Sequence, residues 1–178
     1  MEDIPGYMTS AIATLGGKNL GSSTFHEGVI ETDVDKIGKE GELVGCFSVH
    51  AGYAGASAAK IAKAKFRGSL WSTKQFHSSS KKTVCEGIKS AMLYTQGKVY
   101  DYWIETNQKH GVHSCVVILK DGYVFCGNAG EAGAVLCRAD GDVGLLSVPN
   151  KRLDETQEPA VTSYGLDWED EFVLIACN

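Results

Sequence analysis

The chain has 178 residues, enough for one globular domain with a real hydrophobic core, and we expect residues 1–178 to form a single domain. Apolar residues make up 43% and charged residues 22%, and 21 glycines with three prolines favour a turn-rich ordered fold over disorder. The net charge of −5 argues against nucleic-acid binding through phosphate neutralisation.

Because no targeting signal is visible and the cysteines show no disulfide or zinc pattern, we expect an intracellular protein, cytoplasmic or nuclear. No early segment combines a basic start with an apolar stretch, and the longest apolar run, residues 172–177, is too short to span a bilayer. The six cysteines show no C-x-x-C spacing, and four lie in apolar strand-like runs. Buried reduced thiols are therefore favoured over a disulfide framework or a zinc site.

The first third of the chain is expected to form strands. Weak alternation indicates strands at residues 8–14 and 24–32, separated by Gly16-Gly17. The acidic segment 33–42 holds two glycines and is expected to be a turn or loop. The apolar run 43–49 fits a buried strand.

Two helical segments with a loop between them are expected next. Residues 54–66 are rich in alanine and lysine, which favour helix, and the lysines are expected to form a solvated face rather than a binding patch. The polar stretch 68–82 is expected to be an exposed loop. Residues 83–108 carry a helical apolar stripe, but Gly87 and Gly97 leave open a kinked helix or two pieces.

The rest of the chain is expected to be β-rich, with a hairpin turn at Asp121-Gly122. Expected strands, in chain order, are residues 112–119, 123–127, 133–138, 145–148 and 171–177. The last is apolar on both faces, which predicts neighbours on both sides in a sheet. The sequence stops one residue later, so we expect that a following segment has been lost or that something else covers this strand.

Residues 47–55, Phe-Ser-Val-His-Ala-Gly-Tyr-Ala-Gly, are expected to form a strand end, a tight turn and a helix start. Catalytic carboxylates often lie at such turns, because rigid elements hold them in place. This turn offers Ala51 instead.

Four segments, in order and spanning almost the whole chain, resemble motifs of the metal-dependent Ser/Thr protein phosphatase 2C family. The family's Phe-Gly-Val-Phe-Asp-Gly-His-Gly-Gly resembles residues 47–55, and its Gly-x-Arg-x-x-Met-Glu-Asp resembles residues 16–23. Its Val-Ala-Asn-Val-Gly-Asp-Ser-Arg-Ala-Val hairpin resembles residues 126–135, preceded by 111–114 where the family has Gly-Ser-Thr-Ala. Its Glu-Pro-Glu-Val and Asp-Glu-Phe-Leu-Ile-Leu-Ala-Cys-Asp-Gly resemble the segments 158–161 and 170–178.

The resemblance implies an α+β fold: two stacked antiparallel β-sheets flanked by helices, shortened at the C-terminus and missing the flap segment normally inserted between residues 151 and 158. It also implies a chemistry. Two Mn²⁺ or Mg²⁺ ions, held by Asp carboxylates and water, activate a bridging water that attacks a phosphoserine or phosphothreonine.

Carried over by position, the resemblance implies that most of the metal ligands are substituted. Three Asp positions of the family are occupied by Ser23, Ala51 and Asn178, and a Glu position by Ser22. Two unit charges 4 Å apart interact by about 4 kcal/mol at an effective dielectric constant near 20, so losing these carboxylates removes a large share of cation binding.

The remaining family positions are conserved in part. Lys18 replaces a phosphate-binding Arg and loses its bidentate fork, and Tyr53 replaces a His. Gly52 keeps the backbone carbonyl, and Glu131 keeps a carboxylate where the family has Asp, but one carboxylate cannot hold two cations. We therefore expect no catalytic residue and no metal cofactor.

The favoured hypothesis is a catalytically inactive phosphatase 2C-like protein, a pseudophosphatase, that binds another protein and regulates phosphorylation signalling. No nucleic-acid or membrane partner is expected, and uncovered strand edges suggest a homodimer as an option. One alternative is residual or repurposed hydrolase activity; its candidate residues are His50, Tyr53, His113, Ser114 and Cys115. Adjacent strand residues point to opposite faces, so His113 and Ser114 make a poor dyad. The other alternative is a remnant without independent function.

Overall fold

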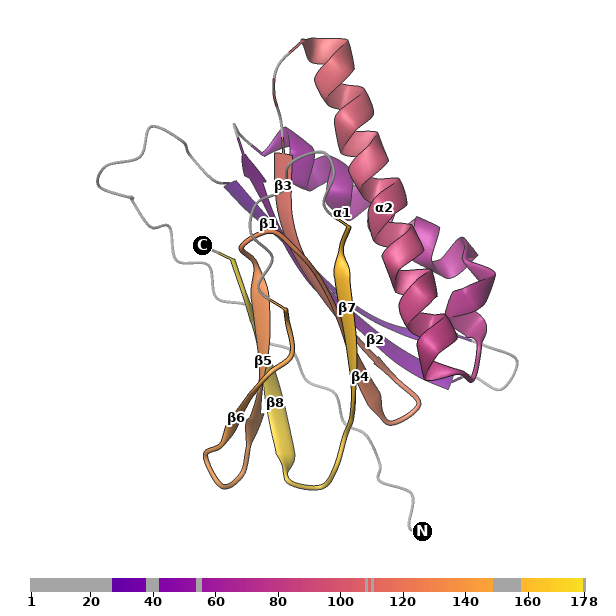
Figure 1. Cartoon of the computed structure of the whole chain (residues 1–178), viewed down its shortest axis with the longest axis vertical. Coiled ribbons are helices and arrows are strands. Elements are labelled where there is room, and N and C mark those ends of the chain that lie inside the picture. Colours follow the sequence, from indigo (N-terminus) through magenta and orange to yellow (C-terminus); the bar gives the residue numbers. More distant parts are fainter. Residues whose placement is uncertain are drawn as a thin grey trace.

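The computed structural model describes residues 27–37, 42–53, 56–107, 109, 111–148 and 158–177 (Figure 1). Its elements, in chain order, are β1 (Glu27–Ile37), β2 (Glu42–Tyr53), α1 (Ser57–Ser72), η1 (Lys74–His77), α2 (Lys81–Thr106), β3 (Gly111–Lys120), β4 (Tyr123–Ala129), β5 (Gly133–Arg138), β6 (Val143–Leu145), β7 (Ala160–Gly165) and β8 (Asp170–Ala176). No helix of the described residues is long and apolar enough to cross a membrane.

The strands form two antiparallel sheets. The large sheet has the order β1-β2-β3-β4-β7, and the small sheet has the order β6-β5-β8. Helices α1 and α2 lie on one face of the large sheet, and the small sheet lies on its other side (Figure 1). The expected α+β architecture of stacked antiparallel sheets with flanking helices is confirmed.

Alternation along the strands of the large sheet divides the hydrophobic core into two layers. On the helix side, Val116, Ile118 and Phe125 pack with residues of α1, η1 and α2. On the other side, Cys115 and Val117 pack with residues of the small sheet. Because successive strand residues point to opposite faces, each functional candidate on β2 and β3 can be assigned to one layer from its parity.

Two segments expected to be loops are ordered elements. β1 extends to Ile37 and β2 begins at Glu42, so the loop prediction for residues 33–42 is wrong for 33–37 and for 42. Asp33 lies opposite Cys46, and Ile37 lies opposite Glu42. Among the described strands β1 is an edge of the large sheet, and edges tolerate charged residues that a buried strand would not. Residues 8–14, 24–26 and 38–41 lie outside the described part of the chain.

The exposed loop predicted at residues 68–82 is wrong for most of that stretch, because only Thr73 and residues 78–80 lie outside helical elements. α1 continues to Ser72, and η1 then places Phe76 in the core, where it is fully buried and stacks on Trp71 at a centroid distance of 5.1 Å. The polar composition of this stretch hid two buried apolar residues, Leu70 and Phe76. α2 runs as one helix, which settles the choice that the two glycines left open. Position 87 requires glycine because η1 approaches α2 closely there: a Cβ at this position would lie 2.8 Å from the Phe76 backbone nitrogen.

The hairpin turn at Asp121-Gly122 is confirmed, with φ of 52° and 73°, the positive values that this tight turn needs at both positions. Three strand predictions are corrected. β6 is Val143–Leu145 rather than residues 145–148, and β7 has no counterpart among the predicted strands. β8 pairs only with β5 among the described strands, so it lies at an edge rather than between neighbours. Leu174 of β8 is 55% exposed.

Candidate functional site

The strand-to-helix turn that resembles the family's metal-binding motif lies at the end of β2. Ala51 is opposite His113 and Gly52 is opposite Val112 in the β2–β3 pairing. Because His113 shares the strand face of Cys115, Ala51 and His113 both lie on the side of the large sheet that faces the small sheet. Ala51 is only 2% exposed, so its methyl group is buried where a carboxylate would otherwise be held.

The turn after β4 brings Glu131 next to His113, the residue opposite Ala51. Its backbone N–H donates to His113 Nδ1 at 3.0 Å, so this nitrogen of His113 is an acceptor. Gly130 has a φ of 83°, and a Cβ there would lie 2.2 Å from His113 Nδ1. Glycine at position 130 therefore both permits the turn and leaves room for the imidazole ring.

The donor set at this place does not fit a pair of divalent cations. The described positions supply a methyl group at Ala51, a backbone carbonyl at Gly52 and one carboxylate at Glu131. Hard cations need several anionic oxygens, and within the described part of the chain no group of three or more His, Cys, Asp or Glu residues could hold a metal ion. Lys18, Ser22, Ser23 and Asn178 lie outside the described residues, as does the side chain of Tyr53, and none of these residue types supplies a carboxylate.

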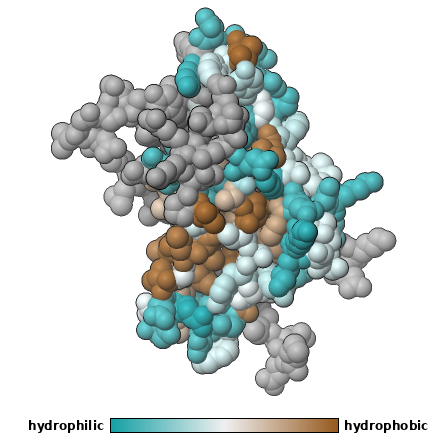
Figure 2. Space-filling model, in the orientation of Figure 1, coloured by the Kyte–Doolittle hydropathy of each residue, from teal (hydrophilic) through white to brown (hydrophobic). Residues whose placement is uncertain are grey.

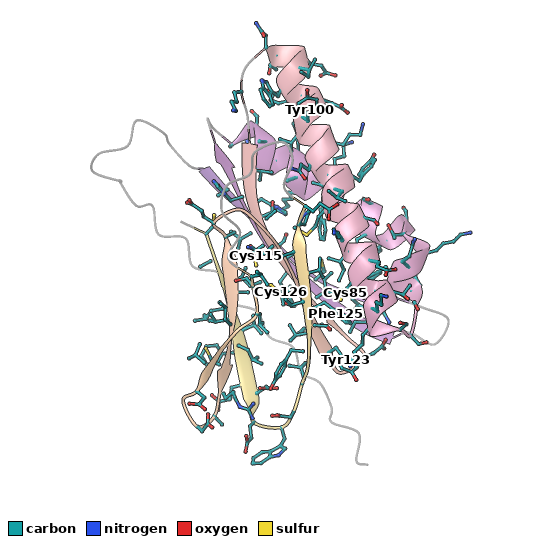
Figure 3. All side chains as sticks on the ribbon, viewed as in Figure 1. Cys85, Tyr100, Cys115, Tyr123, Phe125 and Cys126 are labelled. Carbon is teal, nitrogen blue, oxygen red and sulfur yellow. The ribbon has the colours of Figure 1, made fainter. Side chains whose placement is uncertain are left out.

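A pair of thiols, those of Cys115 and Cys126, lies between the two sheets (Figure 3). Cys115 Sγ is 3.7 Å from Cys126 Sγ. The hydrogen bond with Cys126, together with burial, raises the pKa of the Cys115 thiol, so Cys115 is a poor nucleophile. All six cysteines are thiols rather than disulfides, as expected, but only three are fully buried: Cys46, Cys115 and Cys126.

A second polar cluster lies on the opposite face of the same two strands, toward the helices. The Ser48 hydroxyl is 3.0 Å from His50 Nε2, and the Ser114 hydroxyl is 2.9 Å from His50 Nδ1. A cavity of about 20 Å³ adjoins this cluster, with Phe66 and Met92 among its lining residues. The neutral imidazole can accept from one serine and donate to the other, which satisfies both of its nitrogens.

The environment of His50 disfavours its charged form. Burial, with a smaller contribution from the charge of Lys63, lowers the pKa of His50 to about 4. A base of this strength is poorly matched to proton abstraction near neutral pH. The adjoining cavity has room for about one water molecule, far less than a substrate needs.

The sequence identified His50 and Ser114 as candidates but did not pair them, and it missed Ser48. The signal that joins them is the β2–β3 register, which places His50 directly opposite Ser114. The argument against a His113–Ser114 dyad is confirmed, because His113 lies on the face toward the small sheet and Ser114 lines the cavity on the helix side.

Three comparisons agree on the kind of protein this chain resembles. The family model "Protein phosphatase 2C" matches residues 31–157. "Probable protein phosphatase 2C 45" of Oryza sativa subsp. japonica is 25% identical over 153 residues, which is 86% of this chain and 50% of that protein, so the chain spans about half the length of this curated relative.

Solved structures share the fold. The serine-threonine phosphatase 2C of Toxoplasma gondii matches with a TM-score of 0.67 at 10% identity, covering 86% of this chain and 77% of that one. A bacterial serine phosphatase carrying a point substitution matches with a TM-score of 0.64 at 11% identity, covering 86% and 76%. At such low identity the likeness shows the fold alone.

Proposed function

Since the chain belongs to the protein phosphatase 2C family, we propose that it has lost the metal-dependent phosphatase chemistry of that family and acts by binding another protein in phosphorylation signalling. One observation supports the loss of the metal chemistry: the family-site positions of the chain keep a single carboxylate, Glu131, while Ala51 is buried at the motif position where the family has an Asp. Two adjacent cations held by one carboxylate would repel each other with little compensation.

The decisive experiment is a turnover assay. Purified protein is incubated with Mn²⁺ and a phosphoserine or phosphothreonine peptide, beside an active family member as the positive control. We expect no turnover above the metal blank and no tight Mn²⁺ binding by calorimetry. Robust turnover that EDTA abolishes and that the Glu131→Gln variant loses would overturn the proposal. EDTA-sensitive turnover that the Glu131→Gln variant retains in full, at the same level per mole, would also overturn the proposal if it persists after the protein is purified again.

A repurposed hydrolase is the second candidate, because His50 and Ser114 do meet beside a cavity. Three features weigh against it: the lowered pKa of His50, the small cavity, and serines rather than a carboxylate on both ring nitrogens. A fluorophosphonate probe separates the two candidates. Labelling of Ser114 that Ser114→Ala abolishes and Ser90→Ala retains would favour the hydrolase.

A further inference from the structure

The second half of α2 carries apolar side chains on its solvent side. Leu93, Tyr100 and Ile104 are 39%, 44% and 61% exposed, and Gly97 between them is exposed as well. Residues three and four positions apart are neighbours on a helix surface, so these four positions form one row, which we call the α2 stripe. α2 extends beyond α1 and the sheets at this end, where Figure 3 shows Tyr100 and Figure 2 shows a hydrophobic area (Figures 1–3).

Gly97 leaves a gap in the middle of the α2 stripe. Glycine disfavours a helix interior relative to alanine, so its presence there calls for a packing reason. Gly87 has one within the chain, because η1 lies against it. Position 97 has none among the described residues, since a Cβ there would have nothing within 4 Å. The gap is therefore open to a side chain from another molecule.

The α2 stripe is complementary to an antiparallel copy of itself. The steps from Leu93 to Ile104 are four, three and four residues, so the row has the same spacing when it is read from either end. A two-fold axis at its midpoint sets Leu93 opposite Ile104 of the second copy, and Gly97 opposite Tyr100 of the second copy. Every contact across such an axis occurs twice. The gap of each copy is therefore filled by an aromatic ring of the other.

The charges beside the α2 stripe are complementary in the same arrangement. Lys98 pairs with Asp101 at 2.8 Å and lies 5.6 Å from the centroid of the Tyr94 ring, and all three lie along one flank of the stripe. A two-fold axis turns this flank toward the same flank of the second copy. Asp101 of the second copy then comes level with the turn between Tyr94 and Lys98, so each lysine gains a second carboxylate. Glu105, on the same flank, comes level with residues 91–94 of the second copy, which carry no charge.

We propose that the α2 stripe binds a second copy of this chain, in a two-fold dimer of antiparallel α2 helices with each Tyr100 ring in the gap at Gly97 of the other copy. The dimer uses a helix face rather than the strand edges that the sequence suggested. Self-association goes beyond the proposed function and does not depend on the loss of phosphatase chemistry. One helix face is a small area beside the ~800 Å² per partner of a stable interface, so we expect a weak dimer with a Kd of roughly 10–1000 μM.

The test is sedimentation equilibrium of the full chain over a concentration series that spans this range. Tyr100→Ala removes the ring and Gly97→Leu fills the gap, and each should weaken dimerisation at least ~10-fold. The double variant Gly97→Leu/Tyr100→Ala moves side-chain volume from one side of the contact to the other, so it should dimerise more tightly than Gly97→Leu alone. Leu145→Gln, at a position on β6 that is 63% exposed, is the matched control and should leave the dimer unchanged. Thermal unfolding checks that every variant is folded.

A chain that stays monomeric throughout the series would overturn the proposal, and so would a dimer that Gly97→Leu leaves intact. Equal loss in Leu145→Gln and Tyr100→Ala would overturn it as well, because the contact would then not be specific to α2. A double variant no better than Gly97→Leu would rule out the pairing of position 97 with position 100. Phosphatase turnover decides the proposed function and sedimentation decides this surface, so the failure of either is distinguishable from the failure of the other.

Discussion

His50 and Ser114 are direct partners in the β2–β3 pairing, and His50 Nδ1 lies 2.9 Å from the Ser114 hydroxyl. The Ser48 hydroxyl lies 3.0 Å from the other ring nitrogen of His50, Nε2. A buried neutral imidazole is fully satisfied by two hydroxyls, whereas an imidazolium would bury a charge without a counter-ion. The cluster is therefore built to keep His50 neutral, and it ties two central strands together beneath the helices.

The first prediction concerns pH. The unfolded chain takes up a proton at His50 below pH 6.5, but the folded chain does so only near pH 4. This contribution to stability is therefore complete above pH 6.5 and is lost progressively as the pH falls toward 4, by about 3 kcal/mol at about 1.4 kcal/mol per pKa unit. Urea unfolding at a series of pH values measures the slope. His50→Gln should remove it, whereas His77→Gln, at an exposed position, should retain it.

The second prediction concerns the serine partner. Ser114→Ala leaves a buried imidazole nitrogen without its hydroxyl, so we expect a loss of about 1–3 kcal/mol in the free energy of unfolding. Ser90 also makes one hydrogen bond, to the Glu86 carbonyl, but it is exposed. Ser90→Ala should therefore change stability by less than about 0.5 kcal/mol. Equal effects of the two substitutions would contradict a structural role for the buried cluster.

The fold could be predicted largely from segments whose pattern is local. The sequence predicts the Asp121-Gly122 turn and β5 at their observed positions, because turn propensity and apolar alternation depend on a few adjacent residues. Phe76 could not be placed, since its burial depends on the facing surface of α2 at Gly87 rather than on its polar neighbours. The edge position of β8 also depends on strand order, which no single strand encodes.

The candidate site, too, could be predicted from the sequence only where the signal is local. The family motifs predicted the substitution at Ala51 from sequence alone, and the strand face of that residue follows from alternation. The contact of His50 with Ser114 joins residues 64 positions apart, so it required the register of β2 against β3.

A third prediction compares two glycines of one helix. A Cβ at position 87 would lie 2.8 Å from the Phe76 backbone nitrogen, and η1 cannot shift without moving the buried Phe76 ring. We therefore expect Gly87→Ala to cost about 1–3 kcal/mol. At position 97 nothing lies within 4 Å, so Gly97→Ala should stabilise α2 by up to about 1 kcal/mol through helix propensity. Thermal unfolding of both variants is the measurement, and effects of the same sign would contradict the close approach of η1 to α2.

The last prediction restores the carboxylate that the family motif has lost. Ala51 is 2% exposed, so Ala51→Asp buries a charge, and we expect it to be at least about 2 kcal/mol less stable than Ala51→Asn, which has the same shape without the charge. Burial raises the folded pKa of such an Asp, so the penalty is present above that pKa and disappears as the pH falls below the unfolded value. Chemical unfolding at neutral and acid pH measures the difference. Mn²⁺ at millimolar concentration should not restore the stability of Ala51→Asp, because Glu131 is the one other carboxylate at the family positions. Recovery of about 3 kcal/mol, the gain expected at 100 times the dissociation constant, would show that the remaining donors still assemble a metal site once this carboxylate returns.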